Sequence, residues 1–134
     1  MQEQYEFNTS VTFASGIASG TAKNIDMSLG VLPQSSNYII TVKNASTSAD
    51  MTLSFYNLET IGTSGFSQIC ALVNGASVTT TVPVIMLVPA VTTRAALIGD
   101  GFMNGEAGRI TVTNVTQTTE STGPCIVSVR IRKN

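Results

Sequence analysis

The sequence predicts an all-β protein, a single antiparallel β-sandwich or jelly roll of about eight strands. Apolar and polar residues alternate with period two along most of the 134 residues. No window of a dozen residues keeps the helical spacing i, i+3, i+4, i+7. Ser and Thr make up about a quarter of the chain and charged residues only 11%, so hydroxyls must supply most of the polar surface. The length suits one domain, residues 1–134, with no linker or repeat.

Alternating runs predict the first four strands. The residues that share one face are Tyr5, Phe7, Val11 and Phe13 in the first run, Ile25, Met27 and Leu29 in the second, Ile40 and Val42 in the third, and Met51, Leu53 and Phe55 in the fourth. Residues 44–50, "NASTSAD", are small and polar, as in a hairpin loop. We therefore expect the third and fourth strands to pair antiparallel.

The next two strands are predicted on either side of a tight turn. Residues 65–77 form a strand that ends at Asn74-Gly75, a pair that favours turns because both residues tolerate positive φ. The following run, residues 78–88, is apolar on one face throughout and on both faces in its second half. Pro83 and Pro89 cannot donate a ladder hydrogen bond, so this run lies at a sheet edge or bends.

No charged residue occurs between Glu59 and Arg94. Interface cores are depleted in charge, so the segment "PVIMLVP" (83–89) within this stretch is predicted to face another protein chain, or a copy of itself. The alternative is that it crosses the middle of the sandwich core, buried on both sides. A glycine-rich loop adds two exposed apolar candidates, unless these fold back onto the core. The candidate interface residues are Val84, Ile85, Met86, Leu87, Val88, Phe102 and Met103.

The C-terminal third contains two clear strands, residues 109–116 and 125–133, while residues 91–98 fit either a short strand or a helical turn. Arg130 and Arg132 share a face of the last strand. Such a pair is too small a patch for nucleic acid without interleaved aromatic residues. Acidic residues near the N-terminus would match them where the ends of neighbouring copies meet.

The composition argues against catalysis and against a cofactor. The chain has no His, which removes the commonest general base and metal ligand, and its carboxylates are scattered. In the loop of residues 99–108, Asp100, Asn104 and Glu106 supply oxygens that suit calcium, but their spacing does not match that of a helix-loop-helix calcium motif. We expect a solvated loop with no metal. Cys70 and Cys125 are either two thiols or a disulfide.

Targeting and charge give further expectations. The net charge of −1 offers no steering toward nucleic acid or an anionic membrane. The longest apolar run, residues 82–91, contains two prolines and is too short to span a membrane as a helix. The first residues lack the pattern of a secretory signal, which predicts synthesis in a host cytoplasm without export.

The small Ser/Thr-rich β chain, the segment "VTTTVPVIMLVP" (78–89) and the initial Met1 together resemble the β-sandwich head decoration, or cement, proteins of tailed bacteriophages. The resemblance lies in the overall pattern and transfers no residue role. It implies a non-enzymatic virion protein that binds a capsid shell protein, commonly as a homotrimer, and stabilises the assembled shell.

Two other functions remain open at this stage. A carbohydrate- or receptor-binding module would use aromatic residues in loops, with Tyr38, Tyr56, Phe66 and Phe102 as candidates. A fibre or pilus-like subunit would exchange a terminal strand, and residues 5–13 are regular enough to be donated.

Overall fold

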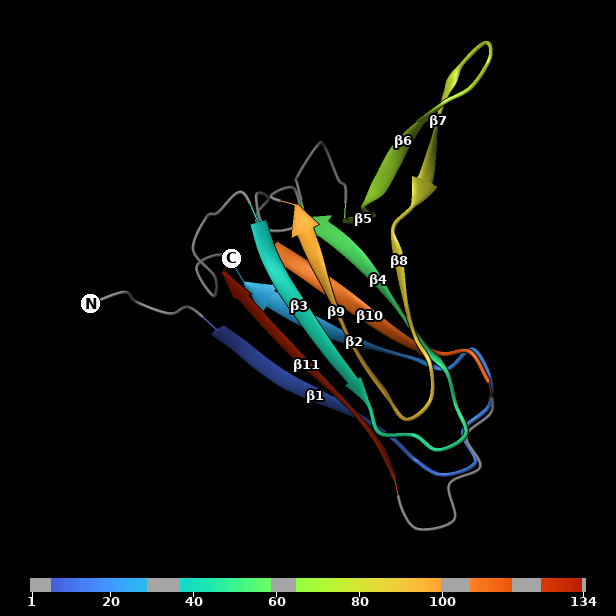
Figure 1. Ribbon diagram of the computed structural model, residues 1–134, viewed down its shortest axis with the longest axis vertical. Helices are drawn as coiled ribbons and strands as arrows, with labels where there is room; N and C mark the ends of the chain where they lie inside the picture. Colours follow the sequence, from blue (N-terminus) through green and yellow to red (C-terminus); the bar gives the residue numbers. More distant parts are fainter. Residues whose placement is uncertain (1–5, 29–36, 59–64, 100–106, 117–123, 134) are drawn as a thin grey trace, which may run out of the picture.

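The computed structural model describes residues 6–28, 37–58, 65–99, 107–116 and 124–133, and every regular element in these ranges is a β-strand (Figure 1). The strands are β1 (Glu6–Phe13), β2 (Ala22–Ser28), β3 (Asn37–Asn44), β4 (Met51–Leu58), β5 (Phe66–Gln68), β6 (Cys70–Asn74), β7 (Thr79–Pro83), β8 (Ile85–Val88), β9 (Thr92–Gly99), β10 (Ala107–Asn114) and β11 (Cys125–Lys133).

Eight of these strands form a two-sheet jelly roll. One sheet has the order β1-β11-β3-β9; in the other, β2, β10 and β4 lie side by side and β8 pairs with β4. The pairs are nested: β1 with β11, β2 with β10, β3 with β9, and β4 with β8. A long hairpin folded over itself gives this arrangement, the pattern of a jelly roll. The predicted fold class is confirmed, and β5, β6 and β7 are additions inserted between β4 and β8.

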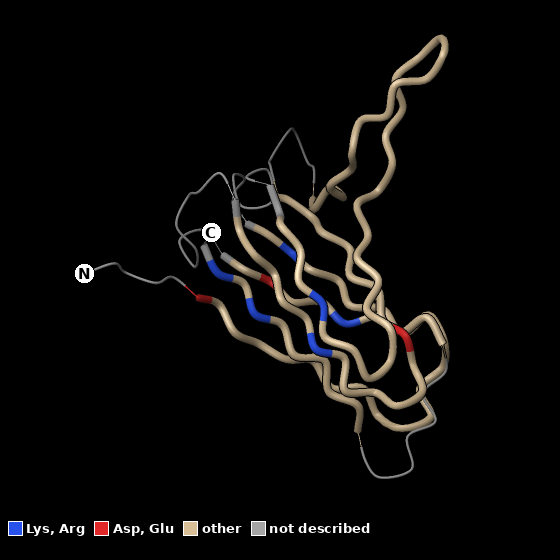
Figure 2. Tube along the Cα trace, viewed as in Figure 1, with Lys and Arg blue, Asp and Glu red and all other residues tan. Residues whose placement is uncertain are grey.

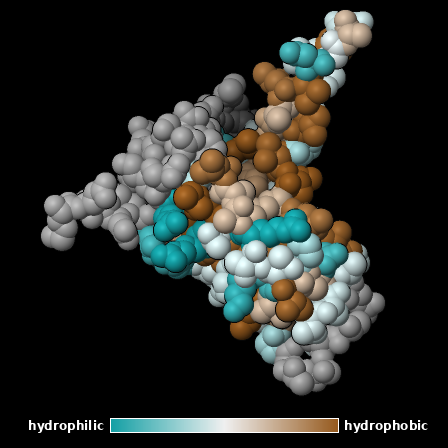
Figure 3. Space-filling model, viewed as in Figure 1, coloured by the Kyte–Doolittle hydropathy of each residue, from teal (hydrophilic) through white to brown (hydrophobic). Residues whose placement is uncertain are grey.

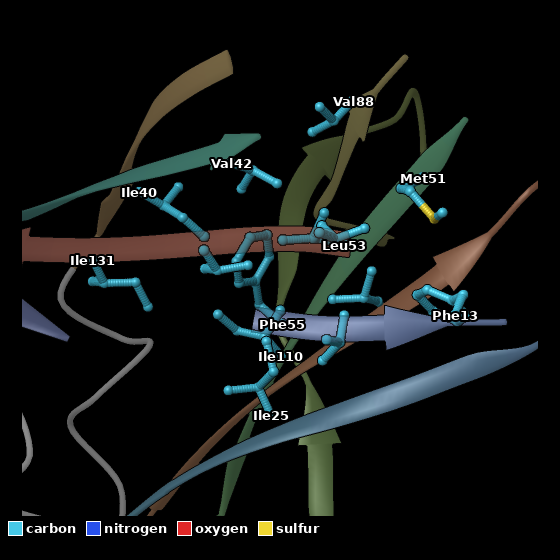
Figure 4. Close-up of a cluster of buried hydrophobic side chains, with 14 of the residues drawn as sticks. Phe13, Ile25, Ile40, Val42, Met51, Leu53, Phe55, Val88, Ile110 and Ile131 are labelled. Carbon is cyan, nitrogen blue, oxygen red and sulfur yellow. The ribbon is translucent and has the colours of Figure 1, made fainter. Parts of the chain in front are cut away.

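The core lies between the two sheets, where side chains from both layers point toward one another (Figure 4). Phe13, Ile40 and Ile131 come from one sheet, and Leu53 and Ile110 from the other; all five are fully buried. The faces predicted from alternation in the first four runs are confirmed where the structure describes them, except that Phe7 is only half-buried. Burial of each large side chain contributes roughly 1.5–3 kcal/mol, which makes this layer the main source of stability.

The predicted pairing of the third and fourth strands is wrong. Strand β3 pairs with β11 and β9, whereas β4 lies in the opposite sheet beside β10. The connection between β3 and β4 therefore crosses from one sheet to the other, and a buried asparagine holds it. Asn44 Nδ2 donates to Ala49 O (2.8 Å) and Val88 O (3.1 Å), and its Oδ1 accepts from Ser46 N (2.9 Å). The small polar residues cap this crossing instead of forming a hairpin turn.

The structure also shows what residues 91–98 form and how the first and last strands pair. The segment at residues 91–98 is a strand, because β9 pairs with β3 along its whole length. Strand β1 pairs with β11 in the same chain, and Arg130 donates to Glu6 across this pair. Glu6 and Arg130 are therefore paired within one molecule, whereas the sequence predicted such a pairing between neighbouring copies. No helix in the described residues has the length and apolar character needed to cross a membrane.

The Glu6–Arg130 pair predicts a small acid sensitivity. The hydrogen bond from Arg130, with a second from Asn8, holds the pKa of Glu6 below its ordinary value. The pair therefore stabilises the fold above the unfolded-state pKa, and this contribution is lost as the pH falls through the folded-state pKa. We expect Glu6→Gln to lose less stability than the native chain between about pH 5 and pH 3. Urea unfolding midpoints at both pH values measure this, and identical losses would show that the pair contributes nothing.

Candidate protein-binding surface

Residues 70–83, here called the arm, form a hairpin that leaves the edge of the second sheet. Strand β5 pairs with β4, and Ile69 N donates to Phe55 O (2.8 Å), which continues this pairing. The chain then turns away through β6, returns through β7, and rejoins the edge at Val84, whose N donates to Ile69 O (3.0 Å). Both ends of the arm are thus fixed to one point of the sheet, and Figure 1 shows the arm projecting beyond the sandwich.

The turn at the tip of the arm lies where the sequence predicts it, but its glycine is needed for a reason other than the predicted positive φ. Gly75 is absent from the positive-φ residues of the described chain, which include Gly16 and Gly20. A Cβ on Gly75 would lie 2.7 Å from Val78 O, so glycine is required by close approach of the backbone. Gly75 N donates to Val78 O (2.9 Å), and Thr79 Oγ1 donates to Asn74 Oδ1 (3.1 Å). The tip is therefore a defined four-residue loop.

The arm is exposed on both faces. Apart from half-buried Cys70, every residue of β6 and β7 is exposed, and Leu72 is 77% exposed. The register places Leu72 opposite Thr81 on one face, and Ala71 opposite Val82 on the other. Figure 2 shows no charge along the arm, and Figure 3 shows hydrophobic side chains running along it to the sandwich. A two-stranded hairpin with solvent on both faces is marginally stable, so the arm is suited to burial against a partner.

The predicted interface residues of β8 divide between the core and the surface. Ile85 (55% exposed) and Leu87 (46%) point outward together with exposed Val84, as an interface requires. Val88 is fully buried and Met86 packs against the core, so the prediction for Val88 is wrong: strand alternation turns it into the sandwich. The alternative that this segment is buried on both sides is also wrong.

Ile85 and Leu87 lie at the edge of a larger surface. This surface is the outer face of the sheet that holds β2, β10, β4 and β8. Thr52 lies opposite Leu87, and Ser54 opposite Ile85. We call this surface the hydroxyl face; its polar residues are Asn24, Thr52, Ser54, Thr111 and Thr113. On its described part the only charged side chains are Asp26 and Arg109, which form an ion pair (2.6 Å) at one end. The hydrogen bond to Asp26 raises the pKa of Arg109 above its ordinary value.

The outer face of the other sheet is charged. Glu6, Lys43, Arg130 and Arg132 lie on it, and Figure 2 shows the basic residues of β3 and β11. An open depression of about 570 Å³ lies there, lined in part by Asn8, Thr41, Lys43 and Arg130. The two outer faces of the sandwich therefore differ in charge, a difference that the sequence pattern alone did not assign.

The arm and the hydroxyl face were the features that sequence reasoning missed. Leu72, Val73 and Val82 were not among the predicted interface residues, although an Asn-Gly turn between two uncharged strands was the available signal. Phe102, Met103 and the oxygen-bearing residues of the 99–108 loop lie outside the described residues. No cluster of potential metal ligands occurs in the part of the chain that is described.

The structure also places three of the aromatic residues that the sequence suggested for sugar binding. Tyr38 is fully buried and cannot serve as a surface platform for sugar, whereas Tyr56 and Phe66 are partly exposed. The Arg109 guanidinium lies 4.1 Å from the Phe66 ring centroid, so this ring already contacts a cation of its own chain.

The two cysteines are not joined by a disulfide. Cys70, at the base of the arm, and Cys125, in the core, are both thiols.

Comparisons with known proteins add little. No family model matches the chain, and no curated protein is similar to it. Thirteen chains of solved structures match. One is the crystal structure of the Yersinia pseudotuberculosis-derived mitogen, which is 11% identical with a TM-score of 0.47 over 96% of this chain and 86% of that chain. This likeness is too low to support an argument about function.

Proposed function

We propose that this protein is a non-enzymatic structural subunit that binds other protein chains, a decoration or cement protein on the outside of a viral capsid. The observation that carries the proposal is the arm, an uncharged apolar hairpin held in solvent by a rigid jelly roll. The arm is fixed at both ends by the hydrogen bonds of Ile69 and Val84, so little conformational freedom is lost at its base on binding.

The apolar side chains of the arm gain stability only when a partner buries them. Leu72, Val73, Val78 and Val82 are exposed in the isolated chain. Burying a Val or Leu side chain fully is worth roughly 1.5–3 kcal/mol, and no charge on the arm has to be desolvated in return. A chain that gains this energy only on an assembled shell stabilises that shell by mass action. This is how a cement protein acts.

The other functions have less support. The aromatic residues proposed for glycan binding are dispersed, with Tyr38 buried and Phe66 covered by Arg109. The strand proposed for exchange, β1, is already paired with β11 and contributes Phe13 to its own core. Neither arrangement accounts for the exposed arm.

The test is a binding experiment with particles. Particles from the encoding virus or host are purified on a density gradient and probed with an antibody raised against this chain. We expect the chain to sediment with the particles, and its removal to lower the temperature at which they open. If the chain is absent from the particles and does not bind when added back, the decoration function is wrong.

Charged substitutions in β8 separate binding from folding. Ile85→Glu and Leu87→Glu place a charge on an exposed apolar edge, so we expect the free energy of unfolding to change by about 0.5 kcal/mol or less. We expect the dissociation constant for partner chains to rise at least about tenfold, because the charge must be desolvated. Leu97→Glu in β9, where Leu97 is 67% exposed on the opposite sheet, is the control. Equal losses of folding and binding would show that these residues only support the core.

A further inference from the structure

The arm and the hydroxyl face have matching character. The arm is an uncharged ribbon rich in valine and threonine, with one leucine. The hydroxyl face consists of threonine, serine and asparagine side chains bordered by Ile85 and Leu87, and the only charged groups on its described part are the paired Asp26 and Arg109 at one end. Packing two such surfaces together desolvates hydroxyls, which can pair across the contact, and leaves no charge unpaired. The two surfaces therefore fit each other at low electrostatic cost.

The outer face of the opposite sheet is charged and therefore suits the arm less well. It carries Lys43 and Arg132 besides the Glu6–Arg130 pair. Covering these groups with an arm that has no carboxylate would bury cations without a partner, which is strongly unfavourable. The hydroxyl face, where the single Asp26–Arg109 pair lies at one end, is the better site for the arm.

The length of the arm is sufficient for the width of the hydroxyl face. Each strand of the arm has five residues, about 17 Å at 3.4 Å per residue. The outer strands of a four-stranded sheet lie about 14 Å apart at 4.8 Å per strand. One arm is therefore long enough to cross the whole hydroxyl face. It does not lie on the face of its own chain, because it leaves the sheet edge at Ile69 and projects beyond the sandwich (Figure 1).

We propose that the arm of one copy of this chain docks across the hydroxyl face of a second copy. Each copy then donates one arm and accepts one, which is the arrangement found in a closed symmetric oligomer. One face of the arm is buried between copies, and the other remains available to the shell. This inference deepens the proposed function, because it names a second copy as the partner of the same surface.

The experiment uses two complementary variants of the full chain. The donor variant, Leu72→Lys with Val82→Lys, has one charge on each face of the arm. The acceptor variant, Ser54→Arg with Thr111→Arg, places two charges on neighbouring strands of the hydroxyl face. We expect the native chain to be an oligomer by light scattering. Each variant should be monomeric, with a dissociation constant raised at least about thirtyfold.

Mixing the two variants is the decisive step. The acceptor variant keeps an intact arm and the donor variant an intact hydroxyl face, so a mixture should form a one-to-one heterodimer and nothing larger. The control, Thr12→Arg with Ser128→Arg on the opposite sheet, should keep the native mass. Thermal unfolding of every variant verifies that it is folded.

Three results would overturn the inference. These are a native chain that is monomeric at all concentrations, a mixture that stays monomeric, and a control pair that dissociates the oligomer while the acceptor variant does not. A monomeric native chain that still binds particles through its arm would leave the decoration function intact, with the shell protein as the partner of the arm. An oligomer that docks as proposed but never binds particles would remove the decoration function instead.

Discussion

Replacing residues 70–83 by the dipeptide Asn-Gly is expected to leave the jelly roll folded and to abolish association with other chains. The excision joins Ile69 to Val84, which are already linked by the hydrogen bond from Val84 N to Ile69 O (3.0 Å). This is the bond that a two-residue hairpin turn requires, and Asn-Gly is the preferred sequence for that turn. The removed residues are exposed apart from half-buried Cys70, so the core keeps its contacts.

Two measurements distinguish folding from binding in this excised chain. The slope of urea unfolding scales with the surface exposed on unfolding, so it should be almost unchanged, because the arm is exposed in both states. The thermal midpoint should stay within a few degrees, and light scattering should report a monomer. An excised chain that unfolds would make the arm part of the fold, and one that still oligomerises would place the interface elsewhere.

The sandwich could be predicted from the sequence because its signal is local. Alternation assigns each side chain to a face, and Val11, Phe13, Ile25, Leu53 and Phe55 are buried as that pattern requires. Pro83 and Pro89 also predicted that the run of residues 78–88 lies at a sheet edge or bends. Both occur: β8 pairs only with β4 among the described strands, and β7 ends at Pro83.

Strand partners could not be predicted, because pairing depends on contacts distant in sequence. The connection after β3 has the composition of a hairpin loop, yet its asparagine turns inward and binds the carbonyl of Val88, 44 residues away. For the same reason, the arm could not be predicted from the sequence. Residues 78–88 alternate as one strand, but the structure divides them between β7, which pairs with β6, and β8, which pairs with β4. Nothing in the alternation marks that change of partner.

Removing the buried asparagine of the crossing is expected to cost about 3 kcal/mol or more. Asn44 is 1% exposed and is the hydrogen-bond partner of three backbone groups, the carbonyls of Ala49 and Val88 and the N–H of Ser46. Asn44→Ala leaves all three without that partner, and each such buried group costs about 1–3 kcal/mol. The matched control is Asn24→Ala on the exposed hydroxyl face, which should change stability by about 0.5 kcal/mol or less.

The variant Asn44→Asp tests whether the two donated hydrogen bonds carry this cost. An aspartate can still accept from Ser46 N, but its carboxylate faces the carbonyl oxygens of Ala49 and Val88, which repel it. Burial raises the pKa of the introduced carboxyl, so protonation favours the folded state and stability should rise as the pH falls toward about 4. The native chain should not gain stability over that range, since Glu6 acts in the opposite direction. Urea midpoints between pH 7 and pH 4 give the comparison. If this variant is as stable as the native chain at pH 7, the asparagine does not hold the crossing, and packing alone joins the two sheets.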